Sequence, residues 1–178
     1  MPGILFLFDR ASHERIERLW DQMEREFGVA KGYPGALPHF TLHLADRYDL
    51  EATQAVVEEI ANARAPFDVT TTGLGVFTGD LPIVYIPVTR TRTLDDLHLR
   101  LYRSLAPHCN GHVPYYAPEK WMPHISLGQV NITSDALPPV LTWLSHEPLS
   151  WEMSAAKLAI GENSDTGIEL FATFPLRG

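Results

Sequence analysis

The sequence predicts an α+β fold built from two similar halves, residues 1–79 and 80–178, in which outer helices cover antiparallel strands. Three observations support this. Stretches with apolar residues at helical spacing are interspersed with short stretches of period-2 alternation. A strand, a helix, a loop rich in Gly, Pro and Tyr, and a histidine-bearing strand occur in this order twice. No low-complexity linker separates the halves, so we expect one domain, residues 1–178, in which two lobes pack as one unit.

The elements expected in the first half are a buried strand from residue 1 to about 8, a helix between residues 12 and 28, a strand at 39–45, a helix at 50–63 and a strand at 67–77. The first helix is clear because Ile16, Leu19 and Met23 fall on one helical face. Ser12 is suited to cap its start, and Gly28 is suited to end it. A turn at residues 78–82 closes this half.

The elements expected in the second half are a strand at 83–88, a helix, a long loop at 108–123, a strand at 124–130, a helix at 135–145 and two closing strands at 151–160 and 167–174. Leu94, Leu97, Leu101 and Leu105 mark the first of these helices, and Pro107 stops it.

Composition and charge narrow the classes of partner. The chain has 178 residues, of which 45% are hydrophobic and 20% charged, which is ordinary for a globular domain. The formal charge is 14 − 22 = −8, which argues against a broad basic face for duplex DNA or for an anionic membrane. The apolar run at residues 4–8 is too short for a signal peptide or a membrane span. These features predict a soluble, cytoplasmic protein.

The two histidine-bearing strands share one local pattern. Residues 38–42 read PHFTL and residues 123–127 read PHISL, which is proline, histidine, apolar, hydroxyl, apolar in both cases. A histidine two positions before a serine or threonine occurs about once by chance in such a chain. The full pattern, twice and at equivalent places in two similar halves, points to a functional role.

Strand geometry gives the pattern a chemical meaning. Residues i and i+2 share one face of a strand, so His39 lies beside Thr41, and His124 lies beside Ser126. Each imidazole is then about 6–7 Å along the strand from a hydroxyl that can donate to a phosphate oxygen. One neutral and one protonated histidine facing each other across a cleft can serve as general base and general acid. Such a pair suits displacement at phosphorus, which needs the base and the acid on opposite sides.

The duplicated pattern resembles the 2H phosphoesterase superfamily, and most closely its 2′-5′ RNA ligase / cyclic phosphodiesterase branch. The resemblance extends over nearly the whole chain and includes residues 72–77, TGLGVF. It implies a bilobal fold with pseudo-two-fold symmetry and an active cleft between the lobes. It also implies that His39 and His124 are the catalytic pair, that Thr41 and Ser126 hold the phosphate, and that no metal or other cofactor is needed.

The resemblance also implies a substrate class. Members of this group hydrolyse cyclic phosphodiesters, and some join RNA ends through 2′-5′ linkages with a hydroxyl in place of water. A small nucleotide or RNA-end substrate is expected here, and the low basic content favours a small one. No obligate protein partner is implied.

Other residues near the motifs are candidates for binding the substrate. Strict alternation would place His43 on the same strand face as His39, in the wall of the cleft, and would turn Leu44 toward the core. Tyr33, Tyr115 and Tyr116 precede the motif strands, where aromatic rings could stack on a base. The alternative for these tyrosines is that they pin the loops to the core.

A metal site is not predicted. Cys109, the single cysteine, is expected to be a small core residue. The remaining histidines show no ligand spacing: His13, His98, His108, His112 and His146. Two other functions stay open, a module of the same fold that binds a nucleotide or phosphate without turnover, and a metal-dependent hydrolase. The second is disfavoured because no carboxylate or cysteine cluster lies near the motifs.

Overall fold

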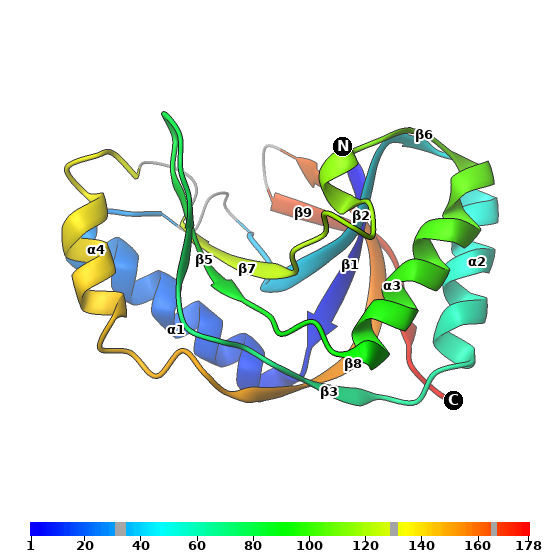
Figure 1. Ribbon diagram of the computed structural model, residues 1–178, viewed down its shortest axis with the longest axis horizontal. Helices are drawn as coiled ribbons and strands as arrows, with labels where there is room; N and C mark the ends of the chain where they lie inside the picture. The colour runs from blue at the N-terminus through cyan, green and yellow to red at the C-terminus, as the bar shows by residue number, and fades with distance from the viewer. Residues whose placement is uncertain (31–34, 129–131, 165–166) are drawn as a thin grey trace.

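The computed structural model describes residues 1–30, 35–128, 132–164 and 167–178 (Figure 1). Its helices are α1 (Arg10–Phe27), α2 (Leu50–Asn62), α3 (Arg92–Leu105) and α4 (Leu137–Leu144), with short 3-10 turns η1 (Ala106–His108) and η2 (Pro114–Tyr116). Its strands are β1 (Pro2–Phe8), β2 (His39–Tyr48), β3 (Phe67–Thr70), β4 (Gly75–Phe77), β5 (Ile83–Pro87), β6 (Cys109–His112), β7 (His124–Gly128), β8 (Glu152–Ser164) and β9 (Gly167–Pro175).

These strands form two antiparallel sheets. The larger has the order β3-β8-β1-β2-β6, with β9 also paired to β8, and the smaller has the order β4-β5-β7. Helices α2 and α3 lie side by side next to the larger sheet, whereas α1 and α4 lie at the other end of the molecule, where α1 contacts β7 (Figure 1). The α+β class predicted from the sequence is therefore confirmed.

The strands are not divided between the sheets by sequence half. Strands β6, β8 and β9 come from the second half but lie in the larger sheet beside β1 and β2. The stretch at residues 67–77, expected to be one strand, is two short strands in different sheets. Gly73 lies between them with φ +69°, a left-handed conformation that breaks an extended strand. The two halves are thus interleaved, and the boundary near residue 79 separates neither the sheets nor the helices.

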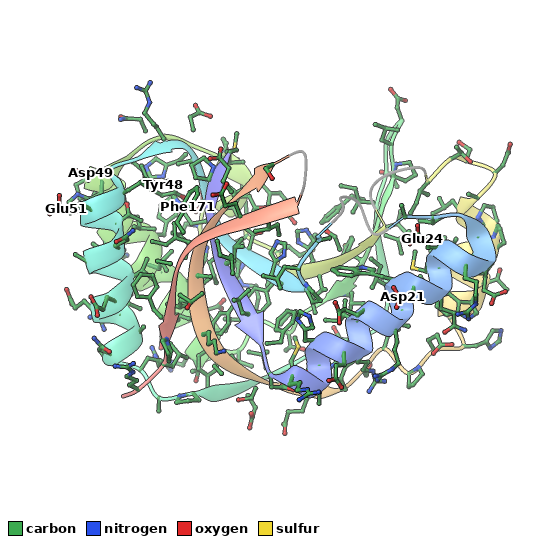
Figure 2. All side chains as sticks on the ribbon, turned by 180° about the vertical axis from the view of Figure 1, so that it is seen from behind. Asp21, Glu24, Tyr48, Asp49, Glu51 and Phe171 are labelled. Carbon is green, nitrogen blue, oxygen red and sulfur yellow. The ribbon has the colours of Figure 1, made fainter. Side chains whose placement is uncertain are left out.

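Helix α1 shows how local sequence sets an element. Asp9, rather than Ser12, is its N-cap, and the Asp9 carboxylate accepts hydrogen bonds from the backbone N–H and the hydroxyl of Ser12. Gly28 ends the helix in the left-handed conformation, as predicted. Asp21 and Glu24 are exposed on its outer face (Figure 2), and the opposite face is buried.

The core lies between the sheets and their helices. Its largest fully buried side chains include Phe6, Phe40, Trp121 and Ile86, which come from β1, β2, the loop before β7, and β5. Phe6 and Phe40 pack with their ring centroids 5.2 Å apart. The strands that carry the histidine motifs are therefore fixed from behind by buried apolar residues. Among the described residues, no helix has the length and apolar character to cross a membrane.

Candidate functional site

The two histidine motifs meet in one pocket of about 270 Å³. His39 and Thr41 line it from β2, and His124 and Ser126 line it from β7. These strands belong to different sheets, so residues of both the larger and the smaller sheet line the pocket. The structure thus brings together all four motif residues that the sequence singled out.

The alternation of β2 and β7 places these side chains as expected. His39 and Thr41 are partly exposed toward the pocket, while Phe40 and Leu42 beside them in the strand are fully buried. In the second strand, Ile125 is likewise buried while its neighbours His124 and Ser126 line the pocket. The apolar residues of each motif therefore anchor the strand, and its polar residues face the cavity.

Each motif strand also carries a β-bulge at the same position. In β2, His43 pairs with Ile4 and Thr41 with Leu5, so that Leu42 is an extra residue. In β7, Gly128 pairs with Val84 and Ser126 with Tyr85, so that Leu127 is the extra residue. Both bulges come three residues after the motif histidine, which indicates that the duplication includes backbone geometry as well as side chains.

The bulge at Leu42 corrects the prediction for His43. One extra residue reverses the alternation beyond it, so His43 is fully buried and is not among the residues that line the pocket. Leu44, expected in the core, lines the pocket instead. The Nδ1 of His43 is hydrogen-bonded to the hydroxyl of Tyr48 at 2.5 Å, on the side of β2 that faces α3. His43 is therefore not positioned to touch a ligand in this pocket.

The two motif histidines are held in the same way. The Nδ1 of His39 is 2.6 Å from the carbonyl oxygen of Leu37, and the Nδ1 of His124 is 2.8 Å from that of Met122. A carbonyl can only accept, so Nδ1 carries the hydrogen and donates it in both rings. In the neutral form this leaves Nε2 of each ring with a free lone pair. Both histidines are thus oriented by a backbone contact and keep one nitrogen for proton transfer.

The electrostatic environment of His39 and His124 disfavours protonation of both imidazoles at the same time. Burial lowers the pKa of both His39 and His124, because desolvation penalises an imidazolium. The hydrogen bonds from Nδ1 to the carbonyls act on each pKa in the opposite direction but less strongly. A positive charge on His124 further lowers the pKa of His39. Protonation of one ring therefore opposes protonation of the other, which is the condition that an acid–base pair requires.

Two tryptophans fix the motif strands, a role that sequence reasoning missed. The indole N–H of Trp121 donates to the carbonyl oxygen of Thr41 at 3.0 Å. The indole N–H of Trp20, on α1, donates to the carbonyl oxygen of Ser126 at 3.2 Å. Each bond joins one sequence half to the motif strand of the other half. The only signal in the sequence for this role is the residue type, because a buried tryptophan usually donates its indole N–H to a partner.

Aromatic rings surround His124. Phe77 and Tyr85 lie at ring-centroid distances of 4.9 and 5.3 Å from its imidazole, both at steep interplanar angles. Tyr115 lies at 6.0 Å and donates its hydroxyl to the carbonyl oxygen of Met122 at 3.3 Å. Tyr115 thus supports His124 and does not line the pocket itself. The contributions of Phe77 and Tyr85 were missed because they come from strands whose pairing the sequence did not indicate.

The other two predicted tyrosines have different outcomes. Tyr116 lines the pocket together with Thr41. Burial raises the pKa of Tyr116, and the side chain of Thr41 acts less strongly to lower it, so the phenol stays neutral. Tyr33 lies outside the described residues.

The charge of the pocket is modest. Among the described residues that line it, none is a lysine or arginine. Glu162 lies at its edge and is paired with the amino group of Met1 at 2.8 Å. The positive charge available to an anion in the described wall therefore comes mainly from a protonated histidine.

Metal-ligating side chains gather elsewhere. His43, Cys109 and His112 offer ligand atoms that all lie within 4.8 Å of one another, on the side of β2 away from the pocket. Cys109 is 9% exposed, in keeping with its expected place at the core. His98 is also buried, donates from Nε2 to the carbonyl oxygen of Leu42 at 3.0 Å, and stacks on Trp121.

Comparison with known proteins agrees with this geometry. The structure is similar to the TT0787 protein of Thermus thermophilus, with a TM-score of 0.67 and 16% identity over 99% of this chain and 98% of that one. It is similar to E. coli LigT complexed with NADP+, with a TM-score of 0.61 and 18% identity over the full length of both chains. It is also similar to E. coli LigT complexed with 3′-AMP, with a TM-score of 0.60, 16% identity and 99% coverage of both. At these identities the likeness shows a common fold.

None of the curated proteins compared with the chain matches it. A family model does match, and it covers residues 8–166, which include both histidine motifs and both tryptophans. With this match over most of its length, the chain belongs to the 2′-5′ RNA ligase superfamily, a group of phosphoesterases and ligases.

Proposed function

We propose that this protein is a metal-independent phosphodiesterase that hydrolyses the 2′,3′-cyclic phosphate of a small nucleotide or RNA end. One observation supports the proposal above all. His39 and His124 line the same pocket, and each donates from Nδ1 to a backbone carbonyl, so that both Nε2 atoms are free to move protons. The family membership supports the phosphoesterase class.

The proposed reaction uses one proton of the pair. The neutral histidine takes a proton from water through Nε2 as the water oxygen forms a bond to phosphorus. The P–O bond to the ribose breaks, and the protonated histidine donates its Nε2 proton to the leaving ribose oxygen. The product is a phosphomonoester, and the positive charge has moved from one ring to the other. A proton exchange with solvent restores the starting state.

Thr41 and Ser126 are the proposed phosphate-binding residues. Both hydroxyls line the pocket on the same strand faces as the histidines, where they can donate to the non-bridging oxygens. Trp121 supports Thr41 and Trp20 supports Ser126, each through a hydrogen bond to the backbone carbonyl. These bonds fix the two motif strands, and each strand carries both a hydroxyl and a histidine. The position of each hydroxyl relative to its histidine is therefore fixed as well.

The size and charge of the pocket favour a small substrate. A volume of about 270 Å³ is near the lower end of ordinary ligand sites. A polymer would need basic side chains along its path, whereas the chain carries a net charge of −8. The solved LigT complexes contain 3′-AMP, ATP and NADP+, which supports a nucleotide as the ligand class. The same pair would catalyse the joining of RNA ends when a 2′-hydroxyl replaces water.

The test is hydrolysis of a panel of 2′,3′-cyclic nucleotides in EDTA by the wild-type protein, by His39→Ala and by His124→Ala. We expect turnover in EDTA and a loss of about 10²- to 10⁴-fold in kcat for each variant, the range for removal of a general acid or base. His146→Ala, which changes an exposed histidine far from the motifs in sequence, is the control and should retain full activity.

Two results would contradict the proposal. Full activity in both single variants would exclude the two-histidine mechanism. Loss of turnover in EDTA, both in the wild type and in Cys109→Ser, with the fold intact by circular dichroism, would exclude metal independence. Tight nucleotide binding with no product after long incubation would instead identify a binding module of the same fold.

A further inference from the structure

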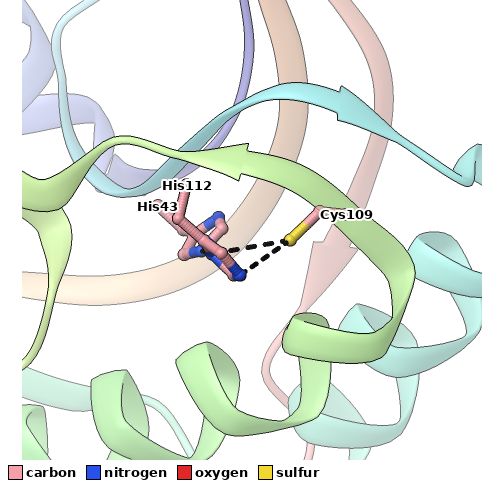
Figure 3. Close-up of side chains that lie close together, drawn as sticks. All are labelled: His43, Cys109 and His112. Carbon is pink, nitrogen blue, oxygen red and sulfur yellow. Dashed lines mark hydrogen bonds between the residues drawn. The ribbon is translucent and has the colours of Figure 1, made fainter.

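A second cluster of reactive side chains lies away from the pocket, between β2, β6 and α3. It consists of His43 from β2 and of Cys109 and His112 from β6 (Figure 3). His43 is fully buried, Cys109 is 9% exposed, and His112 is partly exposed. Figure 3 shows the two imidazoles close together with the Cys109 sulfur turned toward them. The phosphodiesterase chemistry uses none of these groups.

Two of the distances in this cluster are close to the edges of a metal coordination tetrahedron. The Nε2 of His43 is 3.1 Å from the Nδ1 of His112, and the Sγ of Cys109 is 3.6 Å from that same Nδ1. With Zn–N bonds of about 2.0–2.1 Å and a Zn–S bond of about 2.3 Å, a tetrahedral ion separates two nitrogens by about 3.3 Å and a nitrogen from a sulfur by about 3.5 Å. These two distances are within a few tenths of an ångström of the tetrahedral values, and all three ligand atoms lie within 4.8 Å of one another. The Sγ of Cys109 is also 3.8 Å from the Nε2 of His112, so the imidazole of His112 must turn for its Nδ1 to point at a shared ion.

Two departures from regular strand geometry build the cluster. The bulge at Leu42 turns His43 to the buried side of β2. Cys109 and His112 are three residues apart, a spacing that puts side chains on opposite faces of a regular strand. Gly111 between them has φ +70°, and both side chains reach the inner side while residues 110 and 111 stay exposed. The backbone is thus shaped so that all three ligand atoms converge.

The surroundings also fit a metal centre. Tyr48 is hydrogen-bonded to the Nδ1 of His43, which fixes the ring and leaves Nε2 as its ligand atom, as is usual for histidines that bind metals. An imidazole binds a cation through an unprotonated nitrogen, and a cysteine binds it as the thiolate.

We propose that His43 Nε2, Cys109 Sγ and His112 Nδ1 bind one zinc ion, with water in the fourth position. One thiolate and two imidazoles form a donor set that zinc prefers in tetrahedral geometry. Binding releases one proton, from the Cys109 thiol, and involves no redox change. His112 is partly exposed, so solvent and an ion can reach the cluster from its side.

The zinc would stabilise the structure and would take no part in the reaction. It would join β6 to β2, the strand that carries His39 and Thr41. Strand β6 is followed within two residues by η2, which carries Tyr116 into the pocket. Zinc at this position would hold the edge strand and the segment next to the pocket in place, and the phosphodiesterase site would need no metal of its own.

The experiment measures zinc and cobalt binding to the EDTA-treated, dialysed full chain. We expect one zinc per chain by competition with a chromophoric chelator, a higher midpoint of thermal unfolding with zinc, and release of one proton. Cobalt should give a tetrahedral visible spectrum with a thiolate-to-metal charge-transfer band. Cys109→Ser and His112→Gln should weaken zinc binding at least about 100-fold, and Cys109→Ser should lose the charge-transfer band.

Controls separate this site from the catalytic pocket. His146→Ala and the double variant His39→Ala/His124→Ala should bind zinc as the wild type does. Cys109→Ser is close in size to the native residue, and circular dichroism with urea unfolding will verify its fold. No zinc binding by wild type at micromolar concentration would overturn the proposal. So would undiminished binding in Cys109→Ser and His112→Gln, or loss of binding in the catalytic double variant.

Discussion

Replacement of His98 by phenylalanine tests how buried histidines couple pH to the stability of the site. His98 is 1% exposed, and its ring stacks on Trp121 with centroids 3.8 Å apart and an interplanar angle of 3°. Its Nε2 donates to the carbonyl oxygen of Leu42, the bulge residue behind the first motif. Burial lowers the pKa of His98 from 6.5 to about 4. Between pH 6.5 and about 4, His98 is therefore mostly neutral in the folded protein but protonated in the unfolded chain.

The sign and size of the effect follow from these two pKa values. Above pH 6.5 the ring is neutral in both states and contributes no pH dependence. As the pH falls from 6.5 toward 4, only the unfolded chain binds the proton, so the free energy of unfolding decreases. The total loss is about 3 kcal/mol, because each pH unit between the two pKa values costs about 1.4 kcal/mol. His43, whose pKa is also lowered to about 4, should contribute a similar loss.

The assay is urea unfolding at a series of pH values from about 7.5 to about 4.5, in EDTA so that no metal binds His43. His98→Phe should be less stable at pH 7, because the carbonyl of Leu42 loses a donor, but it should lose less stability on acidification than the wild type. The exposed His146→Phe controls for the removal of one histidine and should keep the wild-type slope. An unchanged pH slope in His98→Phe would refute the reasoning, since it would mean that His98 titrates normally in the folded state.

Three further predictions concern the pocket. Thr41→Val and Ser126→Ala should each raise KM for a cyclic nucleotide about 10-fold or more with a smaller effect on kcat, because each removes a hydrogen bond to a charged phosphate; a fall in kcat alone in steady-state assays would contradict this. The pH profile of kcat/KM should decline as pH rises above about 6.5, since the lowered pKa values of the pair deplete the protonated acid; an optimum above about pH 8 would be inconsistent with this. Trp121→Phe should lower the free energy of unfolding by about 1–3 kcal/mol, measured by urea titration, because the carbonyl of Thr41 loses its buried donor; full stability would count against that contact.

Much of the fold was predictable because local patterns dominate it. The period-2 alternation of the motif strands and the helical spacing of α1 and α3 are set by residues close in sequence, and the structure contains all of them. The grouping of strands into sheets was not predictable, because β6, β8 and β9 join a sheet whose other strands lie far away in the sequence. Pairing over that range is decided by packing of the whole chain, which no local window reveals.

The candidate site shows the same limit on a smaller scale. His39, Thr41, His124 and Ser126 were identified because each pair lies within one strand before its bulge. The prediction for His43 was wrong because the bulge at Leu42 reverses the alternation of buried and pocket-facing residues. A leucine at that position does not indicate a bulge. The indole donors of the two tryptophans were missed for a related reason. Each acts across the two halves, on a carbonyl whose need for a donor is visible only in the folded chain.

The surroundings of the two equivalent histidines predict which of them is the acid and which is the base. Both rings have the same carbonyl partner two residues upstream and the same bulge three residues downstream, so backbone geometry does not distinguish them. Their neighbours do, because Phe77, Tyr85 and Tyr115 lie around His124 at steep interplanar angles, and we expect these aromatic rings to favour its charged form. The charge of His124 in turn lowers the pKa of His39.

The single proton of the free enzyme should therefore reside on His124, which makes His124 the general acid and His39 the general base in hydrolysis. Nitrogen-15 NMR of the two imidazoles, assigned with His39→Ala and His124→Ala, should show His124 titrating at higher pH. It should also show the apparent pKa of His39 rising when His124 is replaced, because the repulsive charge is gone. If His39 held the proton instead, the aromatic surroundings would not control the pair, and the two roles would be reversed.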